Sequence, residues 1–380
     1  MAVLIIFQNG SMDDAFQFRT VMPEVHRFAA KTGRGLLLPT KGSAPVMSWV
    51  MASMLFPEDS DTLFSGPDLP RGYLAALGTG LAPEPSQTWA VLSLTHLRRH
   101  QDRLVFVQGM PAPVDETEHQ ALVASLRAPF ADLGWTIHGM AGREAILSTT
   151  MECPVTVASL DEVGGRSLLE VLPRGDKAGH LLQVLTTGQM ILARARINQE
   201  RVARGSLVLN TPWIHGIGTG VALSGRDNFA GTRGFYFGDD PVGGGLARMA
   251  GWKVMDPGGA QTTIGAVTPT NPWPTDMIVQ AARSGPVLLQ CSVTSADHLR
   301  RTGHETVRHL GDALAAARLG LLLLAEERMG RHENTNDPAS IEWGYSRGRQ
   351  LSSRQWFWNR RTWGKGPTMA VEQGRELWLT

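Results

Sequence analysis

The sequence has little cysteine, little lysine and no long apolar run. Its two cysteines, Cys153 and Cys291, cannot form a disulfide framework, so we expect two buried, inert thiols in a reducing cytosol. No stretch reaches the roughly 18 apolar residues of a membrane-spanning helix, and the apolar start at residues 1–7 is too short for a signal peptide. We therefore expect a soluble, cytoplasmic protein with no membrane span.

Net charge is also nearly absent. The 380 residues include 36 basic and 35 acidic side chains, a formal charge of +1, and 42% of the residues are apolar. A nucleic-acid-binding domain has a pI above about 9, so nucleic acid is not expected as a partner. Only five of the 36 basic residues are lysines. A GC-rich genome explains this bias, and bidentate anion recognition by a few arginines is the alternative.

Several common catalytic motifs are missing. The sequence contains no Walker A motif, no Gly-x-Ser-x-Gly, no His-Glu-x-x-His and no Cys-x-x-Cys. Gly216-Ile-Gly-Thr-Gly220 follows a predicted strand, as a phosphate-binding loop would, but residues 221–225 do not begin a convincing helix. A glycine turn is the alternative interpretation of this segment.

Alternating strand and helix patterns predict an α/β protein with a mixed, largely parallel sheet flanked by helices. Strands are predicted at residues 3–7, 89–94, 103–107, 135–140, 144–148, 206–210 and 286–291, and helices at 23–31, 116–133, 178–204, 240–251 and 304–319. Residues 57–88 are rich in Pro, Gly, Ser and Asp and are expected to be a loop or insertion. We expect one elaborated α/β unit over residues 1–340.

A basic, tryptophan-rich segment is expected at residues 341–380. Between Arg347 and Arg375 it has seven basic residues and one acid, Glu372, with tryptophans interleaved. Such a segment can dock its rings on the core while its arginines stay in water. The alternatives are an interface with a protein partner or an anion, stacking on bases, and binding to a membrane surface.

A set of polar residues suggests an anion-binding pocket. Asn198 and Arg201 are three residues apart, so they share a helical face. Asn210, Trp213 and His215 follow at the end of the next predicted strand, where open α/β sheets bind ligands. An arginine, two amides and an indole suit an anionic small molecule, and the alternative is a set of capping and turn interactions.

These residues also support a resemblance. Leu172-Pro-Arg-Gly175, Gln189-Met190, Asn198-x-x-Arg201 and Asn210-x-x-Trp213-x-His215-Gly-x-Gly218 resemble a pattern of archaeal-type, cofactor-independent phosphoglycerate mutases of the alkaline phosphatase superfamily. With the segment Asp239–Leu246 and the Arg- and Trp-rich tail, the chain is more similar to a bacterial offshoot, the RpfE-type regulatory proteins. The likeness is strongest over residues 160–252. It implies an alkaline-phosphatase-like core and a small phosphorylated or carboxylated ligand held by Asn198, Arg201, Asn210, Trp213 and His215.

The chain departs from this family at the metal ligands. The first strand of the mutases ends in a metal-binding aspartate, and Asn9 stands here instead. Ser43 is the nearest candidate nucleophile. His304, Glu326 and Glu327 are the remaining metal-ligand candidates, although the expected aspartates are missing. Hard cations need several carboxylates, so we expect that the metal site is lost and that no cofactor is bound.

Three hypotheses follow. The first is a pseudoenzyme that acts as a regulatory or accessory small-anion-binding protein. The second is an active phosphomutase or phosphatase with Mn or Zn, which would require Asn9, Ser43, His304, Glu326 and Glu327 to converge. The third is a protein-interaction scaffold that uses the C-terminal Arg/Trp segment.

Overall fold

The chain groups into two compact units, which we describe separately. The computed structural model describes residues 2–9, 36–37, 55–56, 69–107, 115–141, 143–220, 234–238, 240–255, 275–293, 320–327 and 340–347, with residues 310, 313, 316 and 317. For residues 2–9, 36–37, 291–293, 320–327 and 340–347 it describes the backbone. Unit 1 comprises Met1–Lys41, Pro45–Ser60 and Ser224–Thr380, and unit 2 comprises Gly42–Ala44 and Asp61–Leu223.

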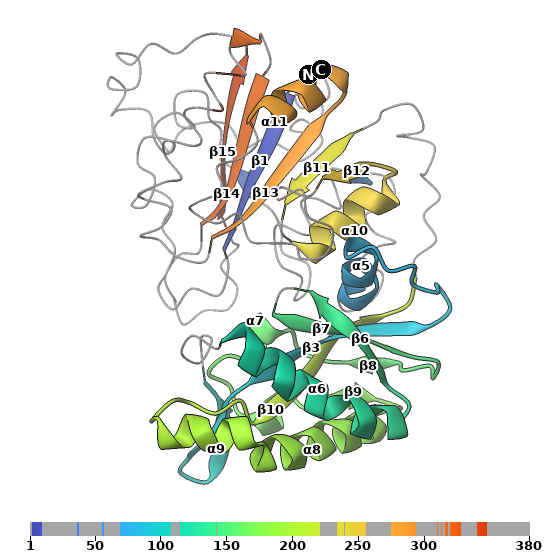
Figure 1. Cartoon of the computed structure of the whole chain (residues 1–380), viewed down its shortest axis with the longest axis vertical. Helices are drawn as coiled ribbons and strands as arrows, with labels where there is room; N and C mark the ends of the chain where they lie inside the picture. Colours follow the sequence, from blue (N-terminus) through green and yellow to red (C-terminus); the bar gives the residue numbers. More distant parts are fainter. Residues whose placement is uncertain are drawn as a thin grey trace. The chain divides into compact units, whose positions relative to one another are not determined.

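Unit 1 is built on a seven-stranded mixed sheet (Figure 1). In sheet order the strands are β12 (Lys253–Met255), β11 (Phe235–Gly238), β13 (Val287–Val293), β1 (Ala2–Asn9), β14 (Gly320–Glu327), β15 (Ser340–Arg347) and β2 (Leu36–Leu37). The pairs from β12 to β14 are parallel, and β15 pairs antiparallel with β14 and β2. Strand β1 therefore has a parallel neighbour on each side.

The interior parallel strands β13, β1 and β14 are rich in apolar residues, as expected for strands with both faces covered. In β13, Val287, Leu288 and Leu289 are all buried. Two helices of unit 1 are described, α10 (Pro241–Met249) and α11 (Thr275–Ser284). Helix α11 buries positions 278, 281 and 282, the spacing of one helical face.

Unit 2 is built on a four-stranded antiparallel sheet in the order β10-β3-β7-β6. The strands of this sheet are β3 (Thr88–Thr95), β6 (Thr136–Ala141), β7 (Glu144–Thr149) and β10 (Thr211–Gly218). Unit 2 also has two two-stranded sheets. One pairs β4 (Leu97–His100) with β5 (Arg103–Phe106), and the other pairs β8 (Val155–Thr156) with β9 (Arg174–Gly175). Its helices are α5 (Arg71–Gly78), α6 (Glu116–Asp132), α7 (Leu160–Val163), the 3-10 turn η1 (Leu168–Glu170), α8 (Ala178–Arg194) and α9 (Arg196–Ala203).

The core of unit 2 lies between the sheet and helices α6 and α8, and α5 covers the other face of the sheet (Figure 1). The predicted apolar positions Leu122, Leu126 and Phe130 of α6 are all buried, which confirms the helical spacing. Gly72 lets α5 lie directly on β3, because a Cβ on Gly72 would be 2.2 Å from the backbone nitrogen of Ala90.

Two predicted elements of unit 2 are corrected. The helix expected over residues 178–204 is two helices, because Ala195 is extended (φ −63°, ψ 128°). The Asn198 side chain donates to the carbonyl of Leu192 at 2.8 Å, which satisfies an acceptor at the end of α8 without continuing the helix. The strand expected over 206–210 is not a strand, and β10 begins at Thr211. The expected loop over 57–88 includes helix α5.

The α/β fold class is confirmed, but a largely parallel sheet is not, because the described pairs outside β12 to β14 are antiparallel. The contacts group the chain into two units, and the single elaborated unit expected over residues 1–340 stays a prediction. Residues 341–347 belong to β15, and the rest of the predicted docking segment lies outside the described residues. In the part of the chain that the structure describes, no helix has the length and apolar character needed to cross a membrane.

Candidate functional site

Asn198 and Arg201 of α9 are buried in unit 2 and bond to the chain itself. Asn198 donates to the carbonyls of Leu192 and Leu209 at 2.8 and 2.9 Å and accepts from the Leu209 amide at 3.0 Å. Arg201 is 2% exposed, donates from Nε to the Leu207 carbonyl at 2.7 Å and forms an ion pair with Glu118 at 2.7 Å. These bonds hold α9 to the extended segment that leads into β10.

Glu118 of α6 receives both Arg201 and Arg204. The hydrogen bond from Arg204 is the main reason why the pKa of Glu118 lies below its ordinary value, and Arg201 adds to it against the effect of burial. Arg201 Nη2 is buried and has no hydrogen-bond partner among the described residues. The guanidinium therefore links α6 to α9 through one carboxylate.

Asn210 and Trp213 are also bonded to the backbone of unit 2. The Asn210 side chain accepts from the Leu97 amide at 2.8 Å and donates to the Leu97 carbonyl at 2.9 Å, as a neighbouring strand would. Trp213 is fully buried and donates from Nε1 to the Ala158 carbonyl at 2.9 Å. The ligand-binding roles of Asn198, Arg201, Asn210 and Trp213 remain predictions, because the bonds seen here are internal.

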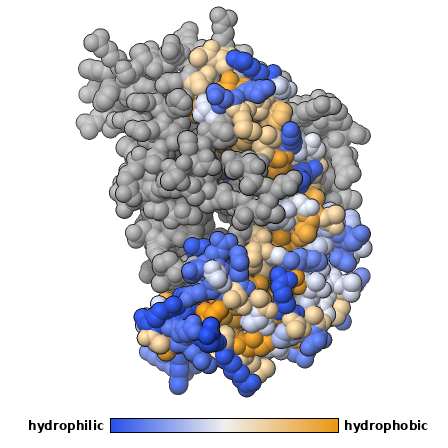
Figure 2. Space-filling view, viewed as in Figure 1, coloured by the Kyte–Doolittle hydropathy of each residue, from blue (hydrophilic) through white to orange (hydrophobic). Residues whose placement is uncertain are grey.

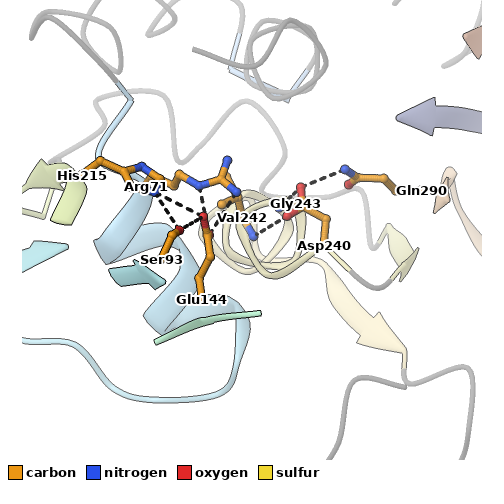
Figure 3. Close-up of polar contacts among 8 residues, drawn as sticks. All are labelled: Arg71, Ser93, Glu144, His215, Asp240, Val242, Gly243 and Gln290. Atoms are coloured by element: carbon orange, nitrogen blue, oxygen red, sulfur yellow. Dashed lines mark hydrogen bonds and ion pairs between the residues drawn. The ribbon is translucent and has the colours of Figure 1, made fainter. Parts of the chain in front are cut away.

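His215 differs from these residues in its partners. Among the described residues, its side chain contacts a serine hydroxyl and a glutamate carboxylate. It lies on β10 in a polar cluster of unit 2 with Ser93 of β3, Glu144 of β7 and Arg71 of α5 (Figure 3). We call these four residues the Arg71 cluster. His215 Nε2 is 3.1 Å from Ser93 Oγ and 3.4 Å from Glu144 Oε1. Arg71 donates to Glu144 Oε2 from Nε at 3.3 Å and from Nη2 at 3.1 Å.

The contacts within the Arg71 cluster keep the Glu144 carboxyl group ionised. Burial alone would raise the pKa of Glu144, but the Arg71 guanidinium and the hydrogen bond with His215 outweigh it and hold the pKa well below its usual range. An ionised carboxylate only accepts hydrogen bonds, so His215 has its proton on Nε2 when it is neutral. His215 Nδ1 is then a buried acceptor with no partner among the described residues. The cluster therefore contains a fixed ion pair with an imidazole and a hydroxyl hydrogen-bonded to one another beside it.

Glycines in the motif after His215 allow α5 to approach β10. Gly216 has φ +58°, and a Cβ there would be 2.5 Å from the Cβ of Arg71. A Cβ on Gly218 would be 2.7 Å from the Cβ of Pro70. Gly216 and Gly218 thus belong to β10, and their lack of a Cβ lets the β10 backbone lie directly against the start of α5. The structure therefore supports close packing as the reason for these glycines.

Unit 1 has a separate buried polar group, formed by Tyr236, Asp240 and Gln290 (Figure 3). Asp240 caps α10 by accepting from the backbone amides of Val242 and Gly243 at 3.2 and 3.3 Å. Gln290 donates to Asp240 Oδ2 and accepts from the Tyr236 hydroxyl, each at 2.8 Å. This group fixes the start of α10 on strand β13.

The candidate metal ligands are described in part. Strands β1 and β14 are parallel with Phe7 paired to Ala325, so their ends at Asn9 and Glu327 reach the same edge of the sheet. Ser43 and His304 lie outside the described residues. Among the side chains that the structure describes, no group of three His, Cys, Asp or Glu residues could hold a metal ion. In the described part of the chain, the candidate ligands at this edge are the amide of Asn9 and the carboxylates of Glu326 and Glu327, and oxygen ligands of this kind are the ones that hard cations prefer.

The comparisons with known proteins agree with an α/β fold of this type. A 2,3-bisphosphoglycerate-independent phosphoglycerate mutase from Methanothrix thermoacetophila is 29% identical over 103 residues, which are 27% of this chain and 26% of that protein. A probable mutase of the same kind from Geobacter sulfurreducens is 22% identical over 271 residues, 68% of this chain and 66% of that protein. The chain thus covers less than two thirds of each relative. No protein-family model matches the chain.

Two solved structures are also similar. The PH0037 protein from Pyrococcus horikoshii has a TM-score of 0.54 at 15% identity, over 90% of this chain and 87% of that chain, which shows a shared fold. A cofactor-independent phosphoglycerate mutase from Thermoplasma acidophilum has a TM-score of 0.48 at 14% identity, over 99% of this chain and 98% of that chain. By sequence, the chain is similar at low identity to cofactor-independent phosphoglycerate mutases.

Of the four residues of the Arg71 cluster, only His215 is predicted from the sequence as a site residue. Ser93 is the polar residue of an otherwise apolar strand, TWAVLSLT between two threonines, which is a usable signal. Arg71 follows Pro70 at the first position of a helix, and Glu144 is the first residue of β7. Neither position is unusual in sequence, because only the pairing of β3 with β7 and the packing of α5 bring these side chains together.

Proposed function

We propose that this protein is a phosphoglycerate-mutase-like protein that binds a small phosphorylated or carboxylated anion and acts as a regulatory or accessory protein. The observation that carries the proposal is Asn9 at the end of β1, the strand with parallel neighbours on both sides. Ligands of open α/β sheets bind beyond the carboxyl ends of such strands. A neutral amide there compensates a cation's lost hydration less well than a carboxylate.

The substrate class follows from the relatives. Both curated relatives are named as phosphoglycerate mutases, and phosphoglycerate has a phosphate and a carboxylate. We propose Arg71 and His215 as the part of unit 2 that contacts the anion, because a guanidinium pairs with phosphate or carboxylate through two parallel hydrogen bonds. The Arg71 side chain is 20% exposed, so its charge is accessible. An anion there would share the Arg71 guanidinium with Glu144.

The experiment is a thermal-shift assay of the full chain with 3-phosphoglycerate in the presence of a chelator. A ligand that binds only the folded state at about 100 times its Kd adds about 2.7 kcal/mol, which raises Tm by several degrees. We expect this rise for the wild type and for Arg194→Met, which removes an exposed arginine of α8, and a smaller rise for Arg71→Met. Equal shifts for all three proteins would exclude Arg71 from the binding site.

A second function has one specific observation in its favour. The parallel register of β1 and β14 places Asn9 and Glu327 at one sheet edge, as a metal-dependent phosphomutase or phosphatase with rearranged ligands requires. This hypothesis predicts that Mn²⁺ or Zn²⁺ supports interconversion of 2- and 3-phosphoglycerate and that Asn9→Ala abolishes it. The binding hypothesis predicts no turnover with either metal, so a coupled mutase assay separates the two.

A further inference from the structure

The carboxylate of Glu144 is held at both of its oxygens. Oε2 accepts two hydrogen bonds from Arg71, from Nε at 3.3 Å and from Nη2 at 3.1 Å. Oε1 accepts from Ser93 Oγ at 3.2 Å and lies 3.4 Å from His215 Nε2. These side chains come from α5, β3, β7 and β10, so four elements of unit 2 set the orientation of this carboxylate (Figure 3).

The ion pair uses one particular edge of the Arg71 guanidinium. A guanidinium has two edges with paired donors, one formed by Nε and a terminal nitrogen and the other by the two terminal nitrogens. Glu144 takes the first edge, because its Oε2 bonds to both Nε and Nη2. A carboxylate or phosphate that pairs with Arg71 through two parallel hydrogen bonds, while Glu144 stays in place, therefore meets the edge formed by Nη1 and Nη2.

The exposure of the side chains separates those that a ligand could reach from those that support them. On the drawn face of unit 2, apolar residues are interspersed with hydrophilic ones (Figure 2). The side chains of Arg71 and Glu144 are about one fifth exposed (20% and 18%), whereas Ser93 is 3% exposed. An anion at Arg71 would therefore meet the ion pair and not Ser93, which acts on such a ligand only through the side chains that it bonds to.

We propose that Glu144 and Ser93 are positioning residues for the bound anion. Glu144 holds the Nε edge of Arg71, so that the Nη1 and Nη2 edge is presented to the ligand, and Ser93 fixes Glu144 from behind. These roles rest on the proposed function, in which Arg71 contacts a phosphate or carboxylate group. They require an arginine at position 71, because the compact ammonium of a lysine has no second planar edge with which to serve both partners.

Calorimetric titration of metal-free, full-length variants with 3-phosphoglycerate tests the two roles. Glu144→Asp keeps the negative charge but draws the carboxylate back by one C–C bond, about 1.5 Å. Arg71 must then follow the carboxylate or lose a bond to it, and we expect an affinity about tenfold lower. Ser93→Ala keeps both charges and removes one donor to Glu144, and we expect an affinity about threefold lower. Arg71→Lys should also bind about tenfold more weakly, although it keeps the positive charge.

Two measurements separate positioning from a general loss of structure. The NMR signal of Arg71 Nε, assigned by its absence in Arg71→Met, should move in both Glu144→Asp and Ser93→Ala, because both changes alter the contact at this nitrogen. Backbone hydrogen exchange of β3 and β7 shows whether the sheet is intact, and if Glu144→Asp weakens the sheet, Ser93→Ala provides the test. Glu152→Asp shortens an exposed carboxylate and should bind like the wild type.

The outcomes distinguish this proposal from the proposed function. If the wild type binds 3-phosphoglycerate and both Glu144→Asp and Ser93→Ala bind within about twofold of it, the positioning roles are overturned while the binding function stands. A loss of affinity in Glu152→Asp as large as in Glu144→Asp would overturn them as well. If the wild type does not bind, the proposed function is refuted, and the positioning roles with it.

Discussion

Replacement of Arg71 by methionine tests the charges of the Arg71 cluster. Breaking a buried ion pair costs about 3–5 kcal/mol, because it leaves one charge without compensation. Here both side chains are about one fifth exposed (20% and 18%), and Glu144 keeps Ser93 and His215 as partners. We therefore expect Arg71→Met to lower the free energy of unfolding of unit 2 by about 2–3 kcal/mol at pH 7.

The effect has a defined pH dependence. The pKa of Glu144 in the folded protein lies below its ordinary value of 4.5, so the ionised carboxylate contributes stability at pH values above 4.5, and this contribution is lost as the pH falls toward the folded-state pKa. The difference between the wild type and Arg71→Met should therefore be constant from pH 8 to 6 and shrink below about pH 5. Native-state hydrogen exchange of β3 and β7 amides, corrected for intrinsic rates, measures it.

A double-mutant cycle provides the control for this prediction. Arg71→Met, Glu144→Gln and the double variant should give a coupling energy of about 1–3 kcal/mol, because the two side chains are in direct contact. A coupling near zero, or a loss of stability that is the same at pH 4 and pH 7, would refute the electrostatic explanation. Either result would mean that Arg71 acts by packing on the sheet.

Three further predictions concern stability and use the same exchange measurement on the unit concerned. Gly216→Ala should cost unit 2 about 2 kcal/mol or more, since φ is +58° and the new Cβ meets α5; a neutral effect would contradict the close approach. Arg201→Met should cost about 2–4 kcal/mol and raise the pKa of Glu118, and an unchanged carboxyl titration by NMR would argue against the ion pair. Gln290→Leu should cost unit 1 about 1–3 kcal/mol by leaving Asp240 with one donor fewer, and a more stable variant would show that this group is dispensable.

The sequence patterns predict the local elements well. The strands around β3, β5, β7 and β13, and the helices α6 and α10, all lie within a few residues of their predicted positions. These elements have a clear apolar period or a clear stop signal. The break at Ala195 was missed because Asn198, three residues later, bonds back to Leu192, and no periodicity reports a side-chain bond of that kind.

The site is harder to predict than the elements. The polar residues Asn198, Arg201 and Asn210 look like ligand groups in sequence, yet their bonds in the structure go to Leu192, Leu209, Leu207, Glu118 and Leu97. The spacing of polar residues shows that they are near one another, but not whether their partners are internal. Glu144 and Arg71, 73 positions apart, meet only because the sheet and α5 bring them together. Such a pair has no local sequence signal.

Calorimetric titration of metal-free protein with 3-phosphoglycerate tests the central claim most directly. Full-length protein, stripped with a chelator and checked by elemental analysis, would be titrated before and after addition of Mn²⁺, and the same samples would be assayed for mutase turnover. The binding function predicts saturable binding in the metal-free protein, little change with Mn²⁺ and no turnover. Binding that appears only with Mn²⁺, together with turnover that requires Asn9, would contradict it and establish a metal-dependent enzyme.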